Sequence, residues 1–331
     1  MVGLVLAGNV SQAICTAVEL GLPRALAGGP RSVEELAEQC QAHPRQLARL
    51  MRVLAAHEVF ARVGSAYELT PLGRTLLVDA EDGRSVAGMA LFAGSGWLAD
   101  ARAALTQSVR TGTSAFRCAH GTDLPEAMQE HPDLARLWEG WSGYSSGVDA
   151  VAGLVVESYD FSSARHVVDL GGRYGSLLAE ILLSVPEMTG TVFDLPDAED
   201  GARALLRARG VEDRARVASG SFFEGVPEGG DLYVLSNVLL DWDDERALEL
   251  LGSCRDVMGP GTRLLVIEPM FGERVLEARG PSLFDLWMMV HSGGMRTVEE
   301  VRQLLDSAGL DVREVLRTSA SAATLIEAEG R

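Results

Sequence analysis

The chain has 331 residues, of which 47% are hydrophobic and 23% are charged, so it has room for two folded domains. Its formal charge of −18 argues against nucleic acid as a partner, because phosphate binding needs a basic surface. No apolar run is long enough to span a membrane, and the first residues lack the basic stretch of a signal peptide. We therefore expect a cytoplasmic protein that is not bound to a membrane.

The first ninety residues are predicted to form short helices and a hairpin. Apolar spacing and turn residues predict helices over residues 11–26, 32–39 and 44–57 and a hairpin of residues 59–63 and 66–69. The second helix begins with a capping box, in which Ser32 is the N-cap and Glu35 lies three residues on. Two helices followed by a hairpin are typical of a winged helix.

A winged helix can bind DNA, and the predicted helix 44–57 carries Arg45, Arg49 and Arg52, which are suited to phosphate contacts. The same helix is dense in apolar positions, and the whole chain is strongly acidic. Dimerisation is therefore the favoured role of this domain, and DNA binding is the alternative.

Residues 90–155 are predicted to be helical. They contain Trp97, Trp138 and Trp141, with Tyr144 close by. An aromatic stripe at helical spacing is more often core than ligand site. Its place just before the next domain also suits the wall of a substrate pocket, so both interpretations remain open.

From residue 164 the pattern changes to alternating strands and helices. Strands are predicted at residues 166–170, 190–194, 215–218, 232–236 and 263–268, with helices at 177–184, 198–209, 245–258 and 298–308. Such alternation predicts an α/β domain whose parallel sheet has helices on both faces, and residues 312–316 and 323–327 add a hairpin at its edge. The expected domains are residues 1–90, 91–155 and 156–331.

A glycine-rich turn follows the first of these strands. Its pattern is Asp169-x-Gly171-x-x-x-Gly175, which differs from the G-x-G-x-x-G of a dinucleotide site, the obvious competitor. Asp194 ends the next strand, where a carboxylate can accept both ribose hydroxyls of a nucleoside. Ser221 and Phe222 follow the third strand, in a place suited to the edge and the face of an adenine ring. Together these features predict an S-adenosylmethionine site.

With the segments 235–245 (LSNVLLDWDDE) and 284–297 (FDLWMMVHSGGMRT), these motifs resemble the S-adenosylmethionine-dependent small-molecule O-methyltransferases of the caffeate type and of bacterial polyketide tailoring. The resemblance covers nearly the whole chain. It implies a Rossmann-like class I methyltransferase domain behind a winged-helix-like dimerisation domain, and an intertwined homodimer whose partner helix helps to close the pocket. It also implies an aromatic or polyketide-like substrate of secondary metabolism.

The resemblance also implies site residues. Those for the cofactor are Asp169, Gly171, Gly175, Asp194, Leu195, Ser221, Phe222 and Ser236. Those for the substrate are Trp97, Trp141, Asn237, Trp287, Met288 and His291. Arg173 replaces the third glycine of the usual turn, so its backbone must tolerate the dihedral angles of that turn.

The sequence departs from the family pattern at the position of the general base. The usual V-L-H-D-W segment supplies a histidine that removes the substrate proton, and Leu240 stands in its place here. The acid that orients this histidine is also missing from segment 293–297. The catalytic candidates are Asp241, His291 and Glu268. Some relatives hold a metal with two histidines, one at each of these places, but one histidine alone remains here, so no metal is expected.

This break resembles the anthracycline-tailoring branch, in which one member methylates a phenol and a close relative performs a hydroxylation that depends on the same cofactor. General-base assistance contributes about 10²–10⁴-fold, so an acidic phenol, enol or carboxylate tolerates its loss best. O-methyl transfer is the leading hypothesis. A non-methylating tailoring enzyme (hydroxylase, decarboxylase or cyclase) is the second, and a non-catalytic regulatory dimer is the third.

Overall fold

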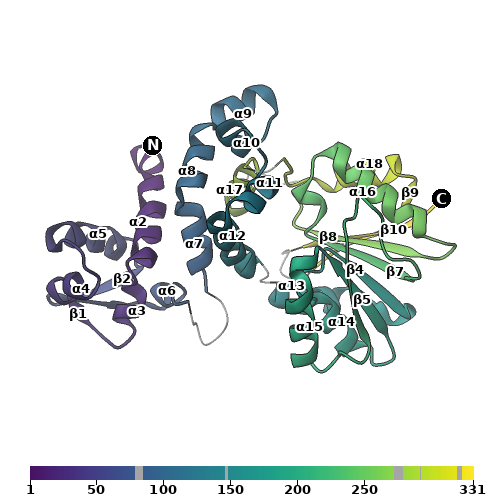
Figure 1. Ribbon diagram of the computed structural model, residues 1–331, viewed down its shortest axis with the longest axis horizontal. Coiled ribbons are helices and arrows are strands. Elements are labelled where there is room, and N and C mark those ends of the chain that lie inside the picture. The colour runs from purple at the N-terminus through teal and green to yellow at the C-terminus, as the bar shows by residue number, and fades with distance from the viewer. Residues whose placement is uncertain (79–84, 146–147, 272–278, 291, 319–322) are drawn as a thin grey trace. The chain divides into compact units, whose positions relative to one another are not determined.

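The computed structural model describes residues 1–78, 85–145, 148–271, 279–290, 292–318 and 323–331 (Figure 1). The chain forms two compact units, Met1–Gly147 and Val148–Arg331. The expected division of the chain into three domains, with boundaries at residues 90 and 155, stays a prediction. Within the described ranges, none of the helices combines the length and the apolar character that crossing a membrane requires.

The first unit is mostly helical. Its elements are α1 (Val2–Val5), α2 (Ala7–Glu19), α3 (Leu22–Leu26), β1 (Arg31–Ser32), α4 (Val33–Gln39), α5 (Pro44–Ala56), β2 (Phe60–Val63), β3 (Ala66–Leu69), α6 (Pro71–Arg74), α7 (Ala87–Gly94), α8 (Gly96–Ala103), α9 (Leu105–Thr111), α10 (Ala115–His120), α11 (Leu124–Glu130) and α12 (Pro132–Ser145). The predicted hairpin is confirmed as β2 and β3, and β1 adds a short antiparallel strand to β3.

The N-terminal helices follow local signals in the sequence. The capping box at α4 is confirmed: the Ser32 N–H donates to Glu35 Oε2 at 2.7 Å, and the Glu35 N–H donates to Ser32 Oγ at 3.2 Å. A single helix over residues 11–26 is wrong, because Gly21 adopts a φ of 68° and separates α2 from α3. Glycine takes this left-handed conformation freely, so the apolar spacing continues across a break in the helix.

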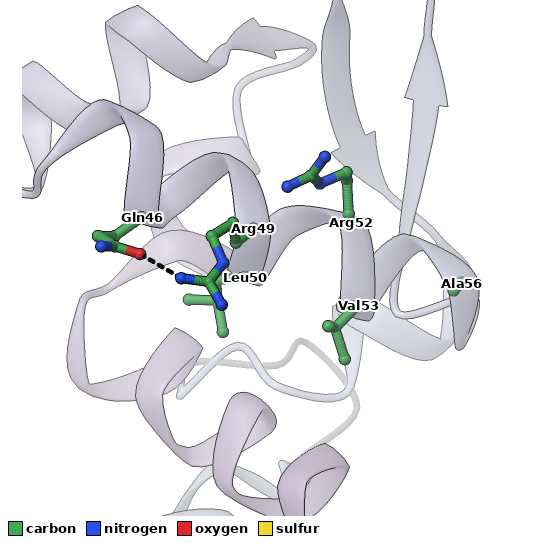
Figure 2. A pocket seen from close by; sticks show the side chains of 6 residues that line it. All are labelled: Gln46, Arg49, Leu50, Arg52, Val53 and Ala56. Carbon is green, nitrogen blue, oxygen red and sulfur yellow. Dashed lines mark hydrogen bonds between the residues drawn. The ribbon is translucent and has the colours of Figure 1, made fainter. Parts of the chain in front are cut away.

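The winged-helix prediction places arginines on α5, and two of them, Arg49 and Arg52, line the pocket that Figure 2 shows. The other lining residues of this pocket are Gln46, Leu50, Val53 and Ala56. Arg49 Nη1 donates to Gln46 Oε1 at 3.0 Å. This pocket contains none of the residues expected to bind cofactor or substrate.

The second unit is an α/β domain. Its elements are α13 (Val148–Ser158), β4 (His166–Leu170), α14 (Ser176–Ser184), β5 (Thr189–Asp194), α15 (Glu199–Ala208), β6 (Ala215–Ser219), β7 (Leu232–Ser236), α16 (Asp244–Val257), β8 (Arg263–Glu268), α17 (Arg279–Met288), α18 (Val298–Ser307), β9 (Leu310–Arg317) and β10 (Thr324–Gly330), with short 3-10 turns at Phe161–Ser163, Pro196–Ala198 and Leu239–Asp241. The predicted bounds of β4, β7 and β8 are confirmed.

The described strands of this unit form one seven-stranded sheet in the order β6-β5-β4-β7-β8-β10-β9. Strands β4 to β8 are parallel, and β10 runs antiparallel to both β8 and β9. The predicted parallel sheet and the hairpin at its edge are thus confirmed.

Helices cover both faces of this sheet, as Figure 1 shows. Successive residues of the central strands β4, β7 and β8 are buried on opposite faces. One core lies under α13, α14 and α15 and includes Val155, Val167, Ile181, Val192, Leu206 and Val234. The other lies under α16 and α18 and includes Val168, Leu235, Leu250, Val266, Val301 and Leu305. A sheet buried on both faces holds the carboxyl ends of its strands in fixed positions.

Candidate active site

The predicted cofactor residues gather at the carboxyl ends of the parallel strands. The chain runs from β4 to β5 and β6 in one direction and from β7 to β8 in the other, so the strand order switches between β4 and β7. Open α/β sheets bind ligands in the crevice outside this switch point. The turn at Gly171 follows β4, Asp194 ends β5, and Ser236 ends β7, on either side of that crevice.

The turn after β4 has no room for a side chain at its glycines. A Cβ at Gly171, whose φ is 73°, would lie 2.7 Å from Val238 Cγ2 and 3.3 Å from Phe222 Cζ. The loops after β4, β6 and β7 therefore meet at Gly171. A Cβ at Gly175, whose φ is 79°, would lie 2.8 Å from Val192 Cγ2, so this glycine lets α14 begin against β5.

Asp169 carries a buried carboxylate beneath this turn. Its side chain is 1% exposed, and neither carboxylate oxygen has a hydrogen-bond partner among the described residues. Burial and then the charge of Asp194 raise the pKa of Asp169 to about 7. A Cβ at Gly172 would lie 2.4 Å from its Oδ2, so glycine is required there as well. A buried carboxylate with unused acceptors suits a cationic ligand, and S-adenosylmethionine carries both a sulfonium and an ammonium group.

Asp194 is oriented by two backbone donors. The Arg173 N–H donates to Oδ2 and the Leu195 N–H donates to Oδ1, each at 2.7 Å. Arg173 adopts a φ of 47°, which confirms the expectation that its backbone tolerates the dihedral angles of the glycine turn. Burial raises the pKa of Asp194, and these two hydrogen bonds oppose the shift. Each carboxylate oxygen has a second acceptor site, which leaves Asp194 able to accept further hydrogen bonds.

The loop after β6 brings an aromatic ring to the same place. The Phe222 ring lies 6.0 Å from the Phe193 ring at an angle of 63°. Ser221 is partly exposed, and its Oγ accepts from the Phe223 N–H at 3.4 Å. The predicted contacts of Ser221 and Phe222 with the adenine ring stay predictions.

The segment after β7 contains Leu240, at the position where the resemblance implies the family's base. Asn237 adopts a φ of 55°, and its N–H donates to Ile267 O at 2.9 Å. The short turn Leu239–Asp241 follows. Leu240 is buried, whereas the Asp241 side chain stays accessible to solvent. Desolvation raises the pKa of Asp241 to about 7.

Glu268 lies behind this turn. Its Oε1 accepts from the Leu240 N–H at 3.0 Å, and its side chain is 1% exposed. Burial raises the pKa of Glu268 to about 7, and the charge of nearby Asp241 adds to the shift. Glu268 thus holds the turn through the backbone of Leu240.

Segment 293–296 also holds the turn Leu239–Asp241 through hydrogen bonds to its backbone. The sequence analysis did not predict this contact. Arg296 Nη1 donates to Leu239 O and Nη2 donates to Trp242 O, each at 2.8 Å. The Gly294 N–H donates to Leu240 O at 2.8 Å. A Cβ at Gly293 would lie 2.0 Å from that same oxygen. The glycine pair and the arginine of the GGMRT segment therefore fix the backbone around Asp241.

Replacing Arg296 by methionine is expected to lower the free energy of unfolding by about 2–4 kcal/mol, since the carbonyls of Leu239 and Trp242 lose their donor. Urea denaturation measures this change. Arg203→Met, which removes an exposed ion pair with Glu199, is the matched control and should change stability by less than about 1 kcal/mol. Equal stability of the Arg296→Met variant and the unaltered protein would show that the arginine does not hold the turn.

The predicted substrate residues lie on both units. The Trp97 indole N–H donates to Asp133 Oδ2 at 3.3 Å, and its ring stacks on Phe116 with centroids 6.1 Å apart. Trp141 is buried beside Phe92. On α17, Met288 is buried and the Trp287 ring stacks on Phe284. His291 lies outside the described residues, and the substrate roles of all these residues, with Asn237, stay predictions.

The chain matches two family profiles. The O-methyltransferase domain matches residues 103–311, and the O-methyltransferase dimerisation domain matches residues 3–79. The predicted fold class is confirmed by these matches and by the sheet. The second match supports the expected homodimer.

Three relatives are informative. The chain is 38% identical to the mitomycin biosynthesis 6-O-methyltransferase of Streptomyces lavendulae, over 96% of this chain and 90% of that protein. It is 34% identical to aclacinomycin 10-hydroxylase of Streptomyces purpurascens, over 93% of this chain and 83% of that protein. An O-methyltransferase from neocarzinostatin biosynthesis, solved with S-adenosylmethionine and 2-hydroxy-5-methyl naphthoic acid, superposes with a TM-score of 0.79 at 31% identity, over 97% of this chain and 96% of that chain.

The fold, the glycine turn and these matches agree with the resemblance found in the sequence. The chain belongs to the O-methyltransferase family and is an enzyme whose cofactor is S-adenosylmethionine.

Proposed function

We propose that this enzyme methylates an acidic hydroxyl of an aromatic or polyketide-like small molecule in secondary metabolism, without a histidine base. The solved relative from neocarzinostatin biosynthesis binds a hydroxylated naphthoic acid, and another relative acts in mitomycin biosynthesis. These relatives support an aromatic or polyketide-like acceptor.

The observation that carries the proposal is the pair Leu240 and Asp241. Leu240 is buried where the family places its base, and a leucine cannot accept a proton. Asp241 is the next residue, is accessible, and has a pKa near 7. Asp241 then takes the proton of the substrate hydroxyl, while Glu268 and Arg296 keep its backbone in place. A base with this pKa is half ionised at neutral pH, which suits a general base.

The cofactor supplies an electrophilic methyl group when it is bound. In the proposed site, Asp194 accepts the ribose hydroxyls, and Asp169 lies where its charge favours the cationic amino-acid part. Gly171 and Gly175 shape the turn that lines the methionine part of the cofactor in this proposal. The residues that border the rest of the cofactor are Leu195, Ser221, Phe222 and Ser236.

A second candidate function is a non-methylating reaction such as hydroxylation. It is supported by the missing base and by the 34% identity with aclacinomycin 10-hydroxylase. A cytoplasmic location is part of the proposal, because the four cysteines Cys15, Cys40, Cys118 and Cys254 are all free, as expected in a reducing compartment.

Incubation of the enzyme with methyl-labelled cofactor and a panel of phenols, enols and hydroxylated naphthoic acids tests the proposal. We expect labelled product and S-adenosylhomocysteine in equal amounts. A substrate that changes while the cofactor stays intact would favour the non-methylating reaction. Cofactor binding without turnover on any member of the panel would favour a regulatory dimer.

A further inference from the structure

Helix α17 carries two of the residues that the resemblance assigns to the substrate, Trp287 and Met288. Asp285 lies on the same helix, about one turn before Met288. The hydrogen bonds along a helix hold its residues in a fixed relation, so a contact that fixes Asp285 also fixes the place of Trp287 and Met288.

The carboxylate of Asp285 binds the backbone of segment 293–296. The Met295 N–H donates to Asp285 Oδ1 at 2.8 Å. A Cβ at Gly294 would lie 3.4 Å from the same oxygen, so the carboxylate lies directly against this glycine. A carboxylate is a stronger acceptor of a backbone N–H than a neutral group. Asp285 therefore joins α17 to this segment through a short hydrogen bond.

The same segment is bound to the turn Leu239–Asp241. The Gly294 N–H donates to Leu240 O at 2.8 Å, and Arg296 adds its two bonds to carbonyl oxygens of the turn and of the residue after it. The successive N–H groups of Gly294 and Met295 thus go to two different elements, the turn after β7 and α17. The path from α17 to the turn is therefore short and contains few rotatable bonds.

Helix propensity does not explain an aspartate at this position. Asp285 lies in the last turn of α17, which ends at Met288. Aspartate is a weak helix former away from the N-cap, and a negative charge in the last turn opposes the helix dipole. The contribution of Asp285 therefore comes from its hydrogen bond to Met295 and not from the stability of its own helix.

We propose that Asp285 is a positioning residue for the acceptor. Its bond to Met295 fixes α17 relative to the turn Leu239–Asp241, so that a substrate held by α17 meets Asp241 and the methyl group in a reactive alignment. A displacement of about 1 Å between reacting groups can lower a rate by about 10²-fold. This inference rests on the proposed function, since it takes α17 to line the acceptor site.

Steady-state methylation by the full-length enzyme tests the inference, with 2-hydroxy-5-methyl naphthoic acid and the other members of the panel as acceptors. Asp285→Ala removes the acceptor of the Met295 N–H. We expect kcat/KM for the methylated acceptors to fall by about 10–10²-fold. Affinity for S-adenosylhomocysteine should stay within about two-fold, because none of the residues proposed to bind the cofactor lies on α17.

Three further variants separate positioning from charge and from folding. Asp285→Asn keeps an acceptor oxygen at the same place and should retain kcat/KM within about three-fold. Asp285→Glu keeps the charge but extends the side chain by one methylene, and should lose about ten-fold or more. Asp306→Ala is the matched control, since Asp306 is an exposed aspartate of α18 that pairs with Arg331, and it should retain the full rate.

The comparison of the asparagine and glutamate variants keeps the test decisive if Asp285→Ala does not fold. Unchanged kcat/KM in a folded Asp285→Ala variant, or a glutamate variant that matches the asparagine variant, would overturn the role of Asp285 alone. Equal losses of kcat/KM and of S-adenosylhomocysteine affinity, without recovery in Asp285→Asn, would show a general role in folding and would also overturn it. No methylation of any panel member by the unaltered enzyme would overturn the proposed function, and this inference with it.

Discussion

Replacing Asp194 by alanine is expected to weaken S-adenosylhomocysteine binding by about 10²–10⁴-fold. The proposed site uses this carboxylate for two charge-assisted hydrogen bonds to the ribose, each worth about 1.5–3 kcal/mol. The carboxylate is already oriented by the N–H groups of Arg173 and Leu195, so it does not need to reorganise on binding. Isothermal titration calorimetry measures the change.

The exposed neighbour Asp197 provides the matched control for this variant. Asp197→Ala should bind the ligand within about two-fold of the unaltered enzyme. Asp194→Ala will also leave two backbone donors without their acceptor, so circular dichroism must show that the variant is folded. A folded Asp194→Ala variant with full affinity would contradict the proposed cofactor site.

Replacing Asp241 by asparagine is expected to lower kcat by about 10²–10⁴-fold towards a weakly acidic phenol, which is the range of general-base assistance. Asparagine keeps the size of the side chain and removes its ability to accept a proton. Binding of S-adenosylhomocysteine should not change, because the change is confined to proton transfer. Single-turnover methylation with labelled cofactor measures the rate.

Asp256→Asn is the matched control, since Asp256 is an exposed residue of α16 that contacts Arg255. It should retain the full rate. In the Asp241→Asn background, Leu240→His restores an imidazole at the family's base position and should recover part of the rate. A full rate in Asp241→Asn would show that this carboxylate does not take the proton.

Much of the second unit was predictable from sequence because its signals are local. Strands β4, β7 and β8 begin and end at the predicted residues, since each is a short apolar run bounded by turn residues. The capping box at Ser32 was predictable for the same reason: two side chains three residues apart satisfy each other's backbone donors.

Other features depend on contacts that local patterns do not encode. The apolar spacing of the first helix continues through Gly21, so the break between α2 and α3 is visible in the backbone angle alone. β1 is two residues long and exists because it pairs with β3, more than thirty residues away. Helix α17 was not predicted from its sequence.

The candidate site shows the same contrast. The motifs predicted Asp169, Gly171 and Asp194 in one crevice, because the carboxyl ends of neighbouring parallel strands lie together. The bonds from Arg296 to the turn after β7 join residues more than fifty positions apart and have no sequence signature. The sequence predicted that Leu240 stands in the place of the family's base, which stays a prediction, and the structure adds how the surrounding backbone is held.

The pH dependence of methylation, measured with a series of phenols of graded acidity, tests the central claim most directly. Asp241 must be ionised to accept a proton, so the rate should rise with pH to a plateau with an inflection near 7 for every phenol. In Asp241→Asn the inflection should instead follow the pKa of each phenol. An inflection that follows the phenol in the unaltered enzyme would contradict the claim that Asp241 replaces the missing histidine.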